Sequence, residues 1–548
     1  MPRTVRLLLL APFAALALAA PAGAETAPGR VTIPAGAQGS TSEARMAMLP
    51  LANGSLAVAG LTAAGAPEVA ELTGTGALNP SFGSGGIELP AVAMTPTQIV
   101  QEPSGDLLVL GSASNGPGTS AGGGFADWEL LRLLPSGQPD TTFGPGGAVV
   151  LPVQDPGGQA AMQPDGDLVL PSASGPASGG SPATPPPSHA AVARVLPSGH
   201  LDASFGGDGM VTLPVGNDGG PAAILPDGTI YAVGEGSTVP REPSALMRLT
   251  VTGSLDRSFN GGAPLALAQP ASTVVGESDG GALLGMDAPT HDVLERVNAN
   301  GSLDGHWASG GTLSLPSAVT LGQLFPLAGG TTLMVGGDAG LAVPHAKAPA
   351  VGARIVRLTA AGKIDRTLGG PNGLVVPLRF GGADYSVGHL AKLPSNTFSV
   401  GTATAAIDGQ GRILIGGTVQ IGAYVGEGEA TWLQQYAVAR LKSSFRVDPS
   451  FGGPTPLRLS AALPAHPLAA KGVRMTLESS GAAVLDVAVR ARGQVIAQGT
   501  IPCWAAGSRT VTLGFTRAGR RLRHTRARMT VSVRGEDLAG NAARASAH

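Results

Sequence analysis

The sequence predicts an all-β protein, a seven-bladed β-propeller followed by a small β-sandwich. Three observations lead to this fold class. One short string that ends near a large apolar residue recurs seven times between residues 78 and 452. Short apolar runs alternate with turn residues throughout this region. Gly (83 residues) and Pro (46) are abundant while charged residues make up only 13% of the chain, which disfavours long helices because Gly and Pro destabilise helix interiors.

The first 24 residues have the pattern of a secretory signal peptide. Arg3 and Arg6 form a basic start, Leu7 to Ala19 is an apolar stretch, and Ala22-Gly23-Ala24 is a small-residue cleavage site. The apolar stretch is shorter than the ~20 residues that span a membrane. We therefore expect a secreted or cell-surface protein without a transmembrane anchor. Cys503 is the only cysteine, so no disulfide can form within the chain, and we expect it to be a small buried side chain.

The repeats are defined by a corner string of the form Leu-Asp-x-Ser-Phe-Gly. Its large apolar position advances by 61, 62, 54, 48, 61 and 83 residues, which indicates one structural unit with variable insertions. The seven strings, which number repeats 1 to 7, are Leu78–Gly83, Pro139–Gly144, Leu201–Gly206, Leu255–Asn260, Leu303–Trp307, Ile364–Gly369 and Val447–Gly452.

Each repeat reads as four short strands joined by tight turns. In repeat 2, residues 98–101, 106–111, 128–134 and 148–151 are the expected strands, and turns such as Pro103-Ser104-Gly105 separate them. Asp-Gly and Ser-Gly pairs supply the positive-φ residues that such turns require. We expect the repeated Asp to accept backbone N–H bonds at the corner and the repeated Phe to fill the space between neighbouring repeats, so both are framework residues.

Four strands per repeat and seven repeats favour a propeller over an open β-solenoid, whose coils are usually shorter. Two segments compete to complete the last blade. Val31-Thr32-Ile33-Pro34 copies a fourth strand ahead of any first strand, and Pro456-Leu457-Arg458-Leu459 fits the same place. The sequence leaves both open.

These residues carry a specific resemblance. Gln163-Pro164-Asp165-Gly166, the strand Ala191 to Leu196, and the string around Leu201 to Gly206 resemble the delta-sixty repeat family of bacterial secreted and surface proteins. The resemblance covers about residues 30–460 and implies a propeller-like fold and an extracellular setting, but no activity. Repeats 5 and 6 depart from the pattern, with Trp307 and Leu368 in place of Phe, and repeat 7 has Ser443-Ser444-Phe445-Arg446 in place of its Ser-Gly turn.

The chain divides into a signal (1–24), a propeller (25–460) and a tail domain (461–548). Five alternating strands are expected in the tail, at 473–478, 484–489, 495–498, 510–515 and 529–533. Its ending, Asp537 to Asn541, resembles the last-strand turn of bacterial immunoglobulin-like or fibronectin-like modules, which implies a β-sandwich.

Charge separates the two domains. Residues 461–548 carry 13 Lys/Arg and 4 Asp/Glu, whereas residues 25–460 carry 20 and 33. Six arginines gather in and around one expected turn of the tail: Arg517, Arg520, Arg521, Arg523, Arg526 and Arg528. The alternatives for this turn are a polycationic loop that meets phosphate or carboxylate polymers and a solvated hairpin tip.

Motifs for catalysis, metal binding and cofactor binding are not found in the sequence. The nine histidines lack metal-ligand spacing, and there is no H-E-x-x-H or P-loop. G-x-S-x-G occurs at Gly118 to Gly122 and at Gly276 to Gly280, in a Gly-rich loop and in an expected strand-to-strand turn, whereas a nucleophile elbow requires a strand before it and a helix after it. A motif search does not test for a pair of catalytic carboxylates that come from separate blades, so glycoside hydrolysis by such a pair stays an alternative.

Loop placement gives the candidate ligand-binding residues. In a propeller, the connections from second to third strands and from blade to blade open on one face, and the long insertions of this chain fall there. Two of these insertions carry side chains able to hold a sugar or a peptide. The candidate residues are Asp384, Tyr385, His389, Tyr424, Glu427 and Trp432.

The sequence therefore predicts a non-catalytic, monomeric binding or scaffold propeller that recognises an envelope polymer or an extracellular protein through its loop-rich face. A propeller-type hydrolase or lyase acting on an extracellular polysaccharide is the first alternative, and a purely structural surface protein is the second. No cofactor is expected. Nucleic acid is not an expected partner, because the propeller region is acidic and the chain is expected to be exported.

Overall fold

The structure is a computed structural model. It describes residues 25–27, 30–37, 46–62, 65–113, 126–155, 158–174, 189–236, 243–288, 290–317, 319–337, 352–377, 383–386, 392–393, 398–399, 405–424, 430–453, 457–481, 483–503, 506–522, 528–537, 539 and 541–547. The expected signal peptide lies outside these residues. The described chain is almost entirely β, as predicted, with the short α-helix α1 (Arg517–Leu522) and 3₁₀ turns at Pro145–Gly147, Asn260–Gly262 and Gly370–Asn372. No described helix is long and apolar enough to cross a membrane.

Repeats 1 to 6 each form one antiparallel sheet of four strands in chain order, as the turn pattern predicts. Their strands are β3–β6 (Ala47–Pro50, Leu56–Leu61, Pro67–Leu72, Ile87–Glu88), β7–β10 (Met94–Gln101, Leu107–Ala113, Ala126–Leu133, Ala148–Asp155), β11–β14 (Ala161–Met162, Leu168–Ser174, His189–Val195, Met210–Thr212), β15–β18 (Asp218–Ile224, Ile230–Glu235, Ser244–Leu249, Leu265–Leu267), β19–β22 (Ala271–Gly276, Ala282–Met286, Val293–Val297, Thr312–Ser314) and β23–β26 (Gln323–Leu327, Thr331–Gly337, Gly352–Leu358, Leu374–Pro377).

Repeat 7 obtains its fourth strand from the N-terminal part of the chain. Its own strands are β30 (Ala405–Ile407), β31 (Ile413–Tyr424) and β32 (Ala430–Leu441), and β2 (Arg30–Ala37) pairs antiparallel with β32, with Val31 opposite Val438. The other candidate for this place, residues 456–459, does not pair with β32. Leu459 begins β33 (Leu459–Ala462), which belongs to a sheet of the tail domain. The sheet is extended by β1 (Glu25–Ala27), β27 (Ala383–Ser386), β28 (Lys392–Leu393) and β29 (Phe398–Ser399).

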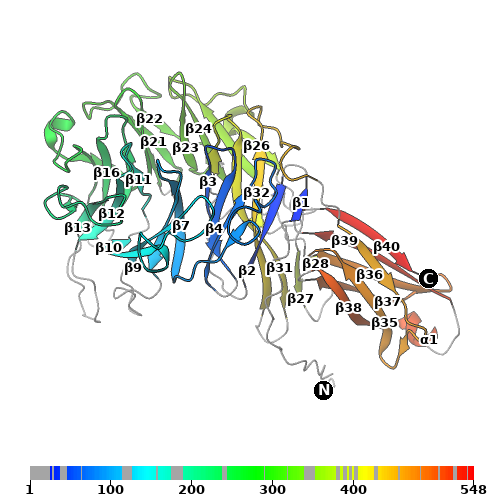
Figure 1. Cartoon of the computed structure of the whole chain (residues 1–548). Coiled ribbons are helices and arrows are strands. Elements are labelled where there is room, and N and C mark those ends of the chain that lie inside the picture. Colours follow the sequence, from blue (N-terminus) through cyan, green and yellow to red (C-terminus); the bar gives the residue numbers. More distant parts are fainter. Residues whose placement is uncertain are drawn as a thin grey trace, which may run out of the picture.

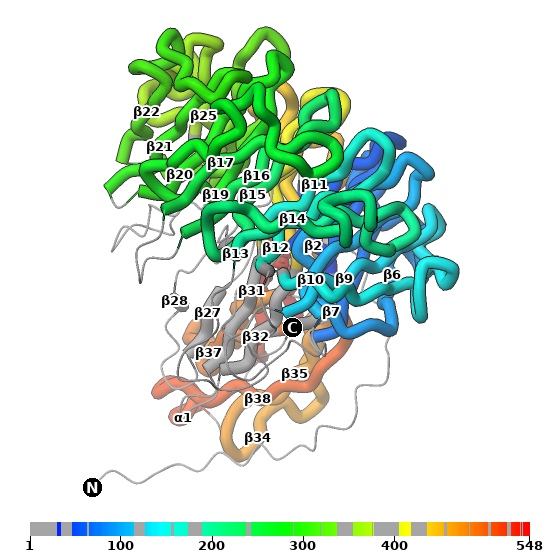
Figure 2. The backbone as a smooth tube through the Cα atoms, turned by 90° about the vertical axis from the view of Figure 1, so that its left-hand side faces the viewer, coloured from blue at the N-terminus to red at the C-terminus, as the bar shows by residue number. Residues whose placement is uncertain are grey.

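The sheets of successive repeats pack side by side around a ring (Figures 1 and 2). Buried apolar clusters lie between neighbours, such as the one that joins Leu333 and Ile355 of repeat 6 to Ile415 and Leu441 of repeat 7. Another joins Val438 to Val58 of repeat 1. Repeat 7 therefore contacts repeat 1, and the repeat region has its core between the sheets.

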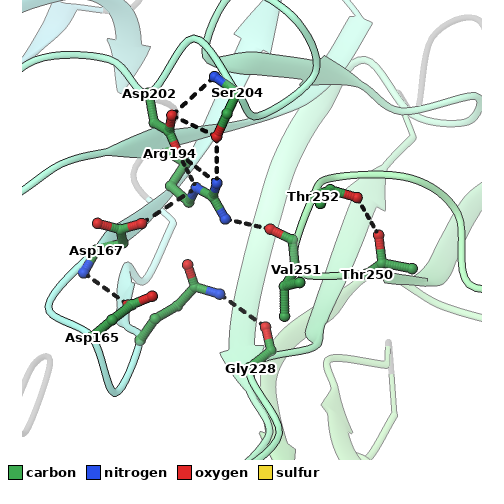
Figure 3. A network of polar contacts seen from close by, with 10 residues as sticks. Asp165, Asp167, Arg194, Asp202, Ser204, Gly228, Thr250, Val251 and Thr252 are labelled. Atoms are coloured by element: carbon green, nitrogen blue, oxygen red, sulfur yellow. Dashed lines mark hydrogen bonds and ion pairs between the residues drawn. The ribbon is translucent and has the colours of Figure 1, made fainter.

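A polar network fixes each corner, and Figure 3 shows it in repeat 3. Arg194 Nε donates to Asp202 at 2.7 Å, and the backbone N–H of Ser204 donates to the same carboxylate at 2.9 Å. Arg194 also bonds the carbonyl oxygen of Val251 in repeat 4. Burial alone would raise the pKa of Asp202, but the hydrogen bonds from Ser204 and Arg194 and the Arg194 charge outweigh it and hold this pKa below its ordinary value.

The corner network recurs around the ring. Arginine and aspartate eight residues apart are paired in repeats 2 to 7: Arg132–Asp140, Arg194–Asp202, Arg248–Asp256, Arg296–Asp304, Arg357–Asp365 and Arg440–Asp448. In repeat 1, Asn79 Nδ2 donates to Glu71 at 2.9 Å instead. The prediction that the repeated Asp is a framework residue agrees with these bonds. The arginine partner was not foreseen, although it stands at a constant spacing in the sequence.

The repeated aromatic fills the space against the next repeat, as predicted. Phe205 is fully buried, and a Cβ added to Gly253 in the following turn would lie 3.0 Å from its ring. At the boundary between repeats 6 and 7, the large and the small residue exchange positions. The corner holds the smaller Leu368, and Phe445 occupies the turn position at φ 61°, with its N–H bonded to the Lys442 carbonyl at 2.8 Å as in the glycine turns. The departures of repeats 6 and 7 thus compensate each other.

The tail domain consists of two antiparallel sheets around one core (Figure 1). One sheet contains β33, β34 (Leu468–Ala469), β35 (Gly472–Ser479) and β38 (Gly507–Gly514), and the other contains β36 (Ala483–Ala491), β37 (Gln494–Cys503), β39 (Met529–Asp537) and β40 (Ala542–Ala547). All five predicted strands are present.

Cys503 is buried in this core as expected, and burial raises the pKa of its thiol. The predicted arginine turn is partly wrong, since residues 517–522 are helical.

Candidate ligand-binding channel and loop face

Four of the six predicted ligand-binding residues lie in strands of the extended sheet of repeat 7. Asp384 and Tyr385 are in β27, which runs parallel to β31, and Tyr424 is the last residue of β31. Asp384 lies opposite Gly422 of β31, and Gly422 lies opposite Trp432 of β32. The backbone thus brings four of the six residues to adjacent strands. His389 and Glu427 lie outside the described residues.

A cavity of about 610 Å³ lies where the first strands of the repeats converge. Repeats 1, 2, 3, 5, 6 and 7 contribute to its lining, which combines apolar side chains with threonines and glutamines. The lining includes Met46, Met48, Leu49, Thr97, Gln98, Ile99, Gln159, Thr273, Val275, Gln323, Phe325 and Ile407. We call this cavity the central channel. Its walls suit an uncharged chain that offers both apolar surface and hydrogen-bonding groups.

Two of the channel glutamines join neighbouring repeats. Gln98 donates from Nε2 to the Ala160 carbonyl and accepts from the Ala160 N–H through Oε1, both at 2.9 Å. Gln323 accepts from the Ala405 N–H in the same manner. A side-chain amide here replaces a backbone pair between first strands that belong to different sheets. These amides hold the shape of the channel, which leaves Gln159 and Thr273 as polar lining groups to contact a ligand.

Four carboxylates gather at the loop face of repeats 4 and 5, the side of the ring where second-to-third-strand connections emerge. Asp218 opens β15 directly opposite Glu235, which closes β16. Asp287 follows β20, and Asp292 precedes β21 and accepts the Leu321 N–H at 2.5 Å. We call these four residues the loop-face carboxylates.

The negative charges of the loop-face carboxylates repel one another. Burial raises the pKa of Glu235, and the neighbouring charges of Asp218 and Asp287 raise it further. Burial likewise raises the pKa values of Asp218 and Asp287, the latter with help from Asp292. One oxygen of Asp218, Oδ1, is buried without a hydrogen-bond partner. Raised carboxyl pKa values are a property that general acids share.

Sequence reasoning missed the loop-face carboxylates because they come from four strand ends of two repeats. Aligning the repeats would have offered one signal, since the equivalent strand ends elsewhere are mostly uncharged. The G-x-S-x-G match at Gly276 to Gly280 is a turn between β19 and β20, as predicted, with no helix after it. The match at Gly118 to Gly122 lies outside the described residues. No group of three or more His, Cys, Asp or Glu side chains among the described residues is placed to hold a metal ion.

Comparison with known proteins supports the propeller fold. Residues 102–143 and 225–259 match the model of a family described as a domain of unknown function (DUF5122) beta-propeller. These segments are parts of repeats 2 and 4, and each ends at or next to the corner aromatic. No curated protein matches the chain.

Solved structures of similar shape include enzymes and proteins of unknown function. The PQQ-bound aldose sugar dehydrogenase of Streptomyces coelicolor is 14% identical with a TM-score of 0.33, covering 60% of this chain and 98% of its own. A protein of unknown function from Dyadobacter fermentans is 11% identical (TM-score 0.33; 62% and 93%). Prolyl oligopeptidase B of Galerina marginata is 9% identical (TM-score 0.38; 80% and 55%). At these TM-scores the functions of the solved structures are not transferred to this chain. Over residues 102–143 and 225–259, the chain is similar to the DUF5122 β-propeller family.

Proposed function

We propose that this chain is a secreted or cell-surface binding protein without catalytic activity, built as a seven-bladed β-propeller with an immunoglobulin-like sandwich. In this proposal the seven repeats of delta-sixty type each make one blade, and β2 completes the seventh. The ligand is a polymer or a protein, taken up from the loop face into the central channel. The composition of the channel lining carries this proposal, because apolar, hydroxyl and amide groups together match a neutral glycan or an extended peptide.

Blocking the channel is expected to weaken binding strongly. Thr273→Trp places a bulky ring among the lining residues, whereas Thr512→Trp puts the same change on the exposed surface of the tail domain. Binding of neutral oligosaccharides and of extended peptides to the mature protein is measured by calorimetry. We expect the channel variant to lose affinity by about tenfold or more, since a filled cavity excludes the ligand, and the surface variant to match the parent protein.

Equal affinities of the two variants would place the ligand outside the channel. If neither class of compound binds the parent protein, the channel has no role as a receptor for neutral chains and the proposal fails.

The loop-face carboxylates favour one second candidate, a hydrolase or lyase acting on an extracellular polysaccharide. Carboxyl groups with raised pKa serve as acids in such reactions. If this candidate holds, release of reducing ends from polysaccharides should fall by about a hundredfold or more in Asp218→Asn or Glu235→Gln. Ser84→Ala, an exposed change in the corner turn of repeat 1, is the control. Absence of polymer cleavage by the parent protein would remove the candidate.

A further inference from the structure

The strand register of the tail domain brings four basic segments to one end. Ala491 lies opposite Met529, so the β36–β37 turn that holds Arg492 meets the start of β39, where Arg528 stands. Gly472 lies opposite Gly514, so the start of β35 meets the end of β38, which leads into α1. We call this end the basic tip.

Helix α1 ties the two sheets together at the basic tip. The Thr516 N–H donates to the Ile496 carbonyl at 2.9 Å, and a Cβ added to Gly519 would lie 2.0 Å from the same oxygen. The helix therefore lies directly on β37, just beyond the turn at Arg492. This close approach explains why the segment folds onto the domain and does not extend as a loop.

Among the residues that the structure describes, eight cations are exposed at the basic tip: Lys471, Arg474, Arg490, Arg492, Arg517, Arg520, Arg521 and Arg528. Within the part of the chain that the structure describes, none of them forms an ion pair with a carboxylate. Their polar contacts are of other kinds, such as Arg520 Nη1 with the Phe515 carbonyl at 3.0 Å and Arg490 Nη1 with Ser532 Oγ at 3.4 Å.

Three of the four carboxylates of the tail domain lie at the opposite end, and the fourth, Asp486, lies in the middle of β36, opposite Arg534. The sequence from residue 461 onward holds four: Glu478, Asp486, Glu536 and Asp537. Asp537 pairs with Ala483, Glu536 with Val484, and Glu478 with Ser508, all remote from the basic tip along their strands. Val484 also belongs to an apolar cluster of repeats 6 and 7. The acidic end therefore contacts the ring, and the basic tip points away from it, as the position of α1 in Figure 1 shows.

We infer that the basic tip is a docking surface for a linear polyanion that bears phosphate or carboxylate groups. Guanidinium groups form paired hydrogen bonds with both kinds of oxyanion. Cations that form no ion pair with a described carboxylate, on an end of the domain from which three of its four carboxylates are remote, produce a local positive potential on a protein whose repeat region is acidic. A linear polymer fits better than a compact anion, because the cations come from four segments spread across the end of the domain. This surface is separate from the central channel.

The test compares two variants of the mature protein with the same change of charge. The tip variant carries Arg492→Gln, Arg517→Gln, Arg520→Gln and Arg521→Gln. The control variant carries Lys363→Gln, Arg366→Gln, Arg534→Gln and Arg544→Gln, which are exposed residues outside the basic tip. Binding of long-chain polyphosphate, of polygalacturonate and of phosphatidylglycerol vesicles is measured between 50 and 500 mM salt, with circular dichroism as the check on folding.

We expect the parent protein and the control variant to bind at least one of the two polymers at low salt, with affinity that falls as salt rises. The tip variant should bind that polymer about tenfold more weakly. The polymer that is preferred identifies phosphate or carboxylate as the group recognised. Thr273→Trp should leave this binding unchanged, so failure of the channel proposal and failure of the tip inference are distinguishable.

Three results would overturn the inference: no binding of either polymer at low salt, an equal loss in the control variant, or tighter binding of vesicles than of both polymers. The last of these would assign the basic tip to an anionic membrane surface.

Discussion

Replacement of Arg440 by methionine is expected to lower the free energy of unfolding by about 3–5 kcal/mol. Arg440 is 2% exposed and Asp448, at 2.9 Å, is 3% exposed, so the variant leaves a buried carboxylate without its counter-charge. Arg440 also donates to the Gly74 carbonyl at 2.6 Å and lies over the Phe451 ring at 4.6 Å. The bond to Gly74 joins repeat 7 to repeat 1, where the ring closes. Denaturation in urea, followed by circular dichroism, measures the change.

The matched control is Arg357→Met in repeat 6. Its side chain is 36% exposed although it forms the equivalent pair with Asp365, so solvent screens the charge that remains, and we expect a loss of about 1 kcal/mol or less. A second variant, Arg440→Met with Asp448→Leu, should recover part of the stability because no unpaired charge is left. Equal losses for Arg440→Met and Arg357→Met would show that the buried corner pairs do not contribute more than the exposed ones.

Replacement of Glu68 by glutamine should remove a pH dependence of stability worth about 2.5 kcal/mol between pH 5 and pH 8. Glu68 is 5% exposed, its Oε1 has no hydrogen-bond partner, and burial raises its pKa from 4.5 to about 7. The folded chain therefore holds this proton when the unfolded chain has released it. The stabilisation is complete below pH 4.5, falls as the pH rises towards 7, and is lost above it.

The measurement is the difference in unfolding free energy between Glu68→Gln and the parent protein at pH 5, 6.5 and 8, since subtraction cancels the titration of other groups. The variant should gain relative stability with rising pH. Glu71→Gln, in the same strand, is the control for loss of a carboxylate that has a partner in Asn79. A difference that does not vary with pH would mean that Glu68 has an ordinary pKa in the folded protein.

The environment of Glu68 lies at the seam between repeats 1 and 7. Its strand neighbour Gly60 has no side chain, and a Cβ added there would lie 2.1 Å from the ring of Tyr436. Burial raises the pKa of Tyr436 to about 12, and its hydroxyl group bonds the backbone of Leu61. Ionisation of Glu68 would therefore place a charge against an aromatic ring at the ring closure.

The strands and turns of the repeats could be predicted from sequence because their signals are local. An Asp-Gly or Ser-Gly pair specifies a turn whatever surrounds it, so strands such as β8 and β9 were foreseen. The choice between residues 31–34 and 456–459 for the last sheet could not be made, since both have the same apolar alternation and only packing against β32 decides. Helix α1 was missed for a similar reason, because its fold depends on contact with Ile496 and its own residues are largely arginine and glycine.

The candidate site shows the same limit. Asp384, Tyr385, Tyr424 and Trp432 were selected from loop composition, and the pairing of β27 with β31 brings their backbones together. The loop-face carboxylates were not selected, because Asp218, Glu235, Asp287 and Asp292 become neighbours only once two sheets stand side by side. The proximity of residues within a single turn or hairpin can be predicted from a sequence, whereas the proximity of residues from two neighbouring sheets of the ring cannot.

The pairing of β2 with β32 has a consequence for the order of events in synthesis. Val31 is synthesised before the repeats, and it can pair with Val438 only once synthesis has reached β32 of the last repeat. Contacts between such distant residues form slowly, because the intervening chain loses much freedom when its ends meet. Each earlier sheet can assemble from its own hairpins as it appears, but the ring stays open until the last hairpin is available. Strand β2 therefore stays without its partner until β32 has been synthesised.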